Sequence, residues 1–93
     1  LAFVGADAVD ERGLHTSCLQ IAQVSRAMIA NAARAILVAD SSKFGHQAFV
    51  RIAGWEAIDH LIVDDGLPPQ ARTWVRKSAG SHTLAPVGDG EKP

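Results

Sequence analysis

Short apolar runs alternate with polar stretches along the chain. Residues 1–5, 36–39 and 60–63 are mainly apolar, and each run ends at a glycine or at acidic residues. Continuous apolar runs of this length with β-branched members predict strands buried on both faces, as in a parallel sheet. A weaker run at residues 83–87 predicts a last strand.

Residues 18–33 have helical periodicity. Ile21, Val24, Met28 and Ala32 recur at helical spacing, which predicts an apolar stripe that packs against a sheet. We expect the hydroxyl of Thr16 or Ser17, just before this helix, to cap its N-terminus.

Residues 70–78 predict a second helix, with Pro69 in its first turn, Gly80 at its end and Trp74 as a core contact. Residues 54–58 predict one further helical turn. Residues 47–52 fit either a short strand or a helical turn, and residues 6–13 predict an acidic loop.

The alternation of strands and helices predicts an α/β fold, with an open parallel sheet flanked by helices and right-handed crossovers. The first residue is Leu1 rather than Met, and apolar residues begin at once. We therefore expect the sequence to be a piece of a longer chain. Residues 88–93 have the composition of a frayed tail.

Composition narrows the function classes. The 93 residues carry a net charge of −1 and no basic stripe, which argues against a self-sufficient nucleic-acid binder. The single cysteine, Cys18, cannot form an internal disulfide. The sequence shows no signal peptide and no apolar run near the ~20 residues of a membrane helix. We expect a cytoplasmic protein with no membrane partner.

The clearest chemistry follows the run at residues 36–39. Asp40, Ser41, Ser42 and Lys43 come directly after it, at the strand end where open α/β sheets bind ligands. An ammonium group such as that of Lys43 is suited to a phosphate. This segment predicts a phosphate-binding loop.

Two further acidic pairs follow predicted strands. Asp7 and Asp10 could be a solvated acidic loop, or carboxylates that accept sugar hydroxyls or do acid–base work. Asp64 and Asp65 precede a glycine and are more typical of turn chemistry.

Other motifs are absent. The sequence has no dinucleotide-binding glycine motif, no P-loop and no nucleophile elbow. His15 and Cys18 have a metal-like spacing, but no other ligands stand at a usual distance. We predict neither a metal nor a cofactor.

Five segments together resemble the C-terminal effector domain of DeoR-family bacterial transcriptional regulators. They are FVGADAVD at residues 3–10, GLHT at 13–16, RAM at 26–28, VADSSKFG at 38–45 and IDHLIVDDGLP at 58–68. The resemblance implies a fold similar to ribose-5-phosphate isomerase and glucosamine-6-phosphate deaminase. Residues 1–87 would be the C-terminal part of the effector domain.

The resemblance also implies partners and site residues. Asp7 matches the aspartate of a Gly-Ala-Asp motif that faces the sugar pocket, and Asp10 is the second acidic position. Lys43 matches the lysine of an Asp-x-Ser-Lys motif at the phosphate, and Asp40 would orient that loop. Operator DNA would be bound by an N-terminal winged helix-turn-helix that this sequence does not contain.

Some positions depart from the family pattern. His15 and Val63 stand where threonine is common, and Gln20 and Gln23 replace frequent acids. These departures concern the identity of the ligand rather than the fold.

Three interpretations remain open. The first is a sensor of a phosphorylated sugar within a transcriptional regulator, typically a repressor of sugar metabolism genes. The second is a fragment of a sugar-phosphate isomerase with Asp7 or Asp10 as base. GLHT lacks the lysine that such an enzyme carries there, so we predict no enzyme and no catalytic residue. The third is a fragment without a competent site. An uncovered sheet edge or face would also favour a homo-oligomer.

Overall fold

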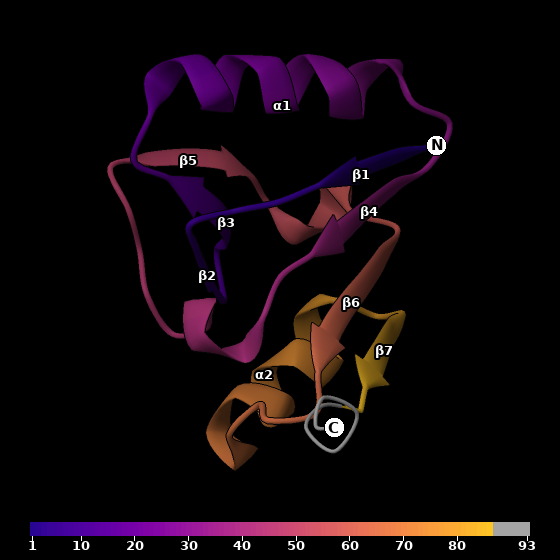
Figure 1. Ribbon diagram of the computed structural model, residues 1–93. Helices are drawn as coiled ribbons and strands as arrows, with labels where there is room; N and C mark the ends of the chain where they lie inside the picture. Colours follow the sequence, from indigo (N-terminus) through magenta and orange to yellow (C-terminus); the bar gives the residue numbers. More distant parts are fainter. Residues whose placement is uncertain (87–93) are drawn as a thin grey trace, which may run out of the picture.

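The computed structural model describes residues 1–86, which form two β-sheets and two α-helices (Figure 1). Four strands make a parallel sheet in the order β1-β4-β6-β7; they are β1 (Ala2–Val4), β4 (Ala35–Val38), β6 (His60–Asp64) and β7 (His82–Ala85). This sheet confirms the predicted parallel α/β class. The predicted tail lies outside the described residues.

A second, antiparallel sheet was not predicted. It contains β2 (Ala8–Asp10), β3 (Gly13–Thr16) and β5 (Val50–Ala53), in the order β2-β3-β5. The expectation of a loop over residues 6–13 was therefore wrong, and the ambiguous segment at 47–52 contributes to a strand. Gly13 makes the hairpin possible: its φ is +137°, and a Cβ there would lie 2.0 Å from the carbonyl oxygen of Ala53.

The helices are α1 (Leu19–Asn31) and α2 (Pro69–Ser78), and two 3₁₀ turns, η1 (Ser41–Lys43) and η2 (Trp55–Ala57), lie between strands. The predicted positions of Pro69 in the first turn of α2 and of Gly80 after its end are confirmed. Neither helix in the described part is long and apolar enough to cross a membrane.

The predicted cap of α1 was wrong. Cys18 occupies the N-cap position, and no side chain caps the helix there. The hydroxyl of Thr16 accepts a hydrogen bond from the Cys18 N–H at 3.3 Å, but it donates its own proton to Asp7. Ser17 contributes its backbone N–H to the same carboxylate.

The apolar stripe of α1 does not face the sheets. Ile21, Val24 and Met28 are exposed, whereas Ala22 and Ser25 are the buried residues of the helix. Small side chains let α1 lie close to β5 and β1. Arg26 also reaches across to β5, where its Nε donates to the carbonyl oxygen of Ile52 at 3.0 Å. Packing against the sheets thus selects the small and hydrogen-bonding face of the helix.

The hydrophobic core lies where the two sheets and α2 meet. Trp74 is half-buried, as expected of a core contact, and its ring lies 5.8 Å from Phe44 and 6.1 Å from Trp55, centroid to centroid. The other large core side chains come from both sheets and from α2; they include Val9, Leu14, Leu37, Ile52, Leu61, Val63 and Val75. The core thereby joins the parallel sheet to the hairpin.

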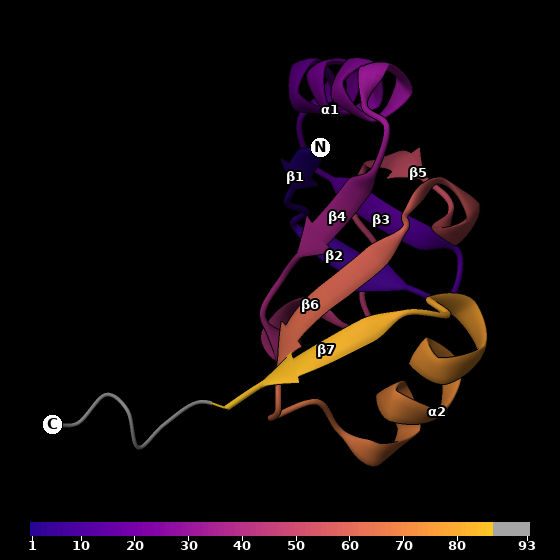
Figure 2. The ribbon, with the colours of Figure 1, turned by 90° about the vertical axis from the view of Figure 1, so that its right-hand side faces the viewer.

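One face of the parallel sheet is open within residues 1–86. Phe3 of β1 is 56% exposed and Val38 of β4 is 46% exposed, and their register partners Ile36 and Ile62 are only partly buried. No described helix or strand lies over this face (Figure 2). The prediction of strands buried on both faces is therefore wrong for the chain by itself.

We propose that copies of the chain associate through this face, because exposed apolar sheet faces favour contact with another surface. Phe3→Ser with Val38→Thr should shift the chain to a monomer in size-exclusion chromatography with light scattering. Val24→Thr on the exposed side of α1 is the control and should leave the oligomer intact. A monomeric wild-type chain would contradict the proposal.

Candidate functional site

The segment after β4 forms a compact loop at the carboxyl edge of the parallel sheet. The Asp40 side chain caps η1: its Oδ1 accepts the Ser42 N–H at 2.9 Å and also the Ser42 hydroxyl. The Lys43 N–H donates to the Asp40 carbonyl at 3.1 Å. Asp40 therefore fixes the turn that carries Lys43.

Asp64, at the end of β6, holds the same loop from the neighbouring strand. Its carboxylate accepts the Ser41 N–H at 2.5 Å, the Ser41 hydroxyl at 2.7 Å and the Gly66 N–H at 3.0 Å. The bonds from Ser41 lower the pKa of Asp64. The turn expected from the sequence at Asp64 accounts only for its bond to the Gly66 N–H. The bonds to Ser41 form because β4 and β6 are neighbouring strands, and the sequence by itself does not specify that strand order.

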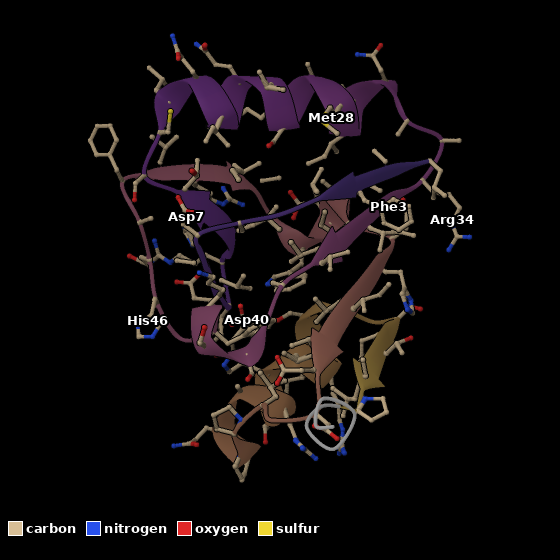
Figure 3. The ribbon with its side chains drawn as sticks, in the orientation of Figure 1. Phe3, Asp7, Met28, Arg34, Asp40 and His46 are labelled. Atoms are coloured by element: carbon tan, nitrogen blue, oxygen red, sulfur yellow. The ribbon has the colours of Figure 1, made fainter. Side chains whose placement is uncertain are left out.

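Asp7 follows β1, and its side chain lies beside the end of β3 (Figure 3). Its Oδ2 accepts the Ser17 N–H and the Thr16 hydroxyl, both at 2.9 Å. These two bonds, together with the positive charge of Lys43, lower the pKa of Asp7. Within residues 1–86, Oδ1 of Asp7 accepts no hydrogen bond. Asp7 therefore stays ionised in the field of Lys43 with one oxygen available.

Asp10 is more fully engaged. It accepts hydrogen bonds from the His15 ring at 2.8 Å, the Gln47 amide at 2.7 Å and the Arg12 N–H at 3.0 Å. Burial raises the pKa of Asp10, but the bonds from His15, Gln47 and Arg12 outweigh it, and the net shift is downward. His15 is only 4% exposed, so this pair belongs to the hairpin's interior more than to an open pocket.

Backbone contacts bring the hairpin to the loop. The Gly45 N–H donates to the Val9 carbonyl at 2.7 Å, and Val9 and Phe44 form an isolated parallel bridge. These contacts place the end of the segment that carries Lys43 against β2, and Asp40 fixes the turn before the lysine. Asp10 is the last residue of β2 and is bonded to His15 of β3.

The chemistry of this set favours binding over proton transfer. Carboxylates with lowered pKa values accept hydrogen bonds well but are poor general bases near neutral pH. Among the described residues, no group of three or more histidine, cysteine, aspartate or glutamate side chains could hold a metal. His15 is bonded to Asp10 rather than paired with Cys18.

The lowered pKa of Asp64 predicts acid sensitivity. An unfolded aspartate titrates near 3.8, so Asp64 contributes stability above that pH and loses it as the pH falls toward its lower folded value. Urea unfolding of Asp64→Asn between pH 6 and pH 2.5 should show a weaker loss of stability on acidification than the wild-type chain.

Asp65→Asn is the matched control, because the Asp65 side chain makes no hydrogen bond within residues 1–86. It should reproduce the wild-type acid profile. Equal acid slopes for Asp64→Asn and the wild-type chain would show that the Asp64–Ser41 bonds do not stabilise the fold.

Sequence comparisons place these features among known proteins. The DeoR C terminal sensor domain matches residues 1–65. The chain is 39% identical over 79 residues to a candidate aga operon transcriptional repressor of Escherichia coli O157:H7, covering 84% of the chain and 29% of that relative. It is 41% identical over 81 residues to the HTH-type transcriptional regulator GlpR of Haloferax volcanii, covering 86% of the chain and 31% of that relative.

The chain thus spans less than a third of the length of these curated relatives. Both are named as regulators and not as enzymes, in agreement with the prediction that no catalysis takes place here. With the match to the DeoR C terminal sensor domain over most of its length, the chain belongs to the DeoR family and matches the C-terminal part of these regulators.

Proposed function

We propose that this chain binds a phosphorylated sugar and is part of a cytoplasmic transcriptional regulator. The observation that carries the proposal is that the segments bearing Asp7 and Lys43 follow β1 and β4, two parallel neighbouring strands, and so leave the sheet at the same carboxyl edge. Open α/β sheets bind ligands at this edge. The combination of one cation and one ionised acceptor matches a ligand that carries both a phosphate and hydroxyl groups.

Each residue would contact a different part of the ligand. The Lys43 ammonium has three donors and no side-chain hydrogen bond within residues 1–86, so it is available to phosphate oxygens. Oδ1 of Asp7 would accept a sugar hydroxyl. Asp40 would keep the turn that carries Lys43 in place. Asp10 would stabilise the β2–β3 hairpin through its bonds to His15, Gln47 and Arg12.

The loops around this edge could report occupancy. The segment that carries Lys43 is bonded to β6 through Asp64 and to β2 through Gly45. A ligand held between Lys43 and Asp7 would favour the arrangement in which these two loops are close together. A ligand can shift a conformational equilibrium only by such differential binding.

The names of the relatives support a role in regulation. One is a candidate repressor of the aga operon and the other is an HTH-type regulator. We therefore propose that the longer protein represses sugar metabolism genes. Its operator DNA would be bound by a helix-turn-helix domain outside this sequence.

A thermal-shift screen against phosphorylated sugars tests the proposal. One sugar phosphate should raise the melting temperature, because a ligand at one hundred times its dissociation constant stabilises a protein by about 2.7 kcal/mol. Lys43→Ala should abolish the shift. Lys77→Ala removes a cation from the last turn of α2, which is not part of the proposed site, and should leave the shift unchanged.

The same screen on a full-length homologue separates two negative results. A shift that appears only in the longer protein would assign the affinity to residues outside this sequence. Absence of any shift in both, or an equal shift in Lys43→Ala, would refute a phosphate site at Lys43.

A further inference from the structure

A cavity lies between α2 and β7, and Lys43 does not line it. It is a cavity of about 40 Å³, and its lining comes from the loop before α2, from α2 and from β7: Leu67, Arg72, Val75, Arg76, His82 and Leu84. His82 and Leu84 are register partners of the buried residues Leu61 and Val63. They therefore lie on the face of the sheet that α2 covers.

The polar groups around this cavity are basic. Arg72 and Arg76 are one helical turn apart, and none of the lining residues is acidic. Like charges at this spacing destabilise a helix unless a counter-charge is present. Within residues 1–86 the only ion pair is the one between His15 and Asp10. The two guanidinium groups therefore have no carboxylate partner in the described part of the chain.

Arg72 is already held in position. Its Nε donates to the Leu67 carbonyl at 2.9 Å and its Nη2 donates to the Asp65 carbonyl at 2.7 Å. Both partners are uncharged, so the cation is fixed without being neutralised. The donors of Nη1 make no hydrogen bond in residues 1–86. A guanidinium fixed in this manner loses little side-chain entropy when it binds an oxyanion.

His82 supplies an independent observation. Its Nδ1 is shielded from solvent and is the only buried side-chain nitrogen or oxygen in residues 1–86 without a hydrogen-bond partner. Buried polar atoms of this kind are rare in folded proteins and point to a bound water or ion. A cavity of this size holds more than one water-sized volume.

We propose that the pocket between α2 and β7 binds the oxyanion of a small molecule, of phosphate or carboxylate type. Arg72 and Arg76 would supply the fork of donors that matches the oxygens of either group. His82 would form the opposite wall. The proposal does not depend on the sugar-phosphate site, because the two sites share no residue.

NMR titration of the ¹⁵N-labelled chain tests this proposal. Inorganic phosphate and acetate are added separately at constant ionic strength and pH. We expect saturable shifts of the Arg76 and His82 amide signals with one anion or both, and the anion with the tighter binding identifies the preferred group. Chloride at the same ionic strength should produce no saturation.

Two variants on α2 test whether anion binding depends on the residues that line the cavity. Arg76→Gln should weaken binding by about tenfold or more, since it removes one charged donor. Lys77→Gln removes an equal charge from the next position, which does not line the cavity, and should bind as the wild-type chain does. Lys43→Ala should also retain these shifts, which separates this pocket from the proposed sugar-phosphate site.

The amide spectrum of each variant verifies that it is folded. Lack of saturable shifts at α2 and β7 with both anions would overturn the proposal. So would equal weakening by Arg76→Gln and Lys77→Gln, because that result would indicate general charge screening.

Discussion

The fixation of the loop after β4 is the constraint on which the candidate site depends. Asp64 holds Ser41, the first residue of η1, through its N–H and hydroxyl, and the Val9 carbonyl holds the end of the loop through the Gly45 N–H. Asp40, the residue before Ser41, closes the turn by accepting the Ser42 N–H. Lys43 is thus carried by a short segment that is bonded to a parallel strand on one side and to the hairpin on the other.

Each of the two sheets contributes a different part of this fixation. The parallel sheet alone would place the ends of β1 and β4 at one edge, because the two strands are direct neighbours. The hairpin adds the second anchor and the partners of Asp7, which come from the end of β3. Packing of Val9 and Leu14 in the common core fixes the hairpin against the parallel sheet.

Local sequence signals predicted much of this structure. The apolar runs located β1, β4 and β6, Pro69 and Gly80 marked the two ends of α2, and strand–helix alternation gave the parallel class. The hairpin was missed because its strands are three and four residues long and contain polar side chains such as Asp10 and His15. Their partners are visible only after folding.

The face of α1 was mispredicted for a different reason. Periodicity identifies the side of a helix that is most apolar, but in these residues the sheets contact Ala22, Ser25 and Arg26, which pack closely or bond to carbonyl oxygens. In the candidate site, too, some residues could be predicted from the sequence pattern and others only from the fold. Strand ends pointed to Asp7, Asp40 and Lys43, whereas the role of Asp64 depends on the strand order, which one sequence does not specify.

The two aspartates near β2 differ in how many of their carboxylate oxygens are used in hydrogen bonds within the chain. Asp10 uses its two carboxylate oxygens on His15, Arg12 and Gln47, so an added ligand would have to compete with partners already in place. Asp7 uses a single oxygen and is more exposed. Its hydrogen bonds fix the direction of the carboxylate while leaving the other oxygen for a ligand. A fixed carboxylate with one available oxygen supports our proposal that Asp7 accepts a hydroxyl of the ligand while Lys43 contacts its phosphate.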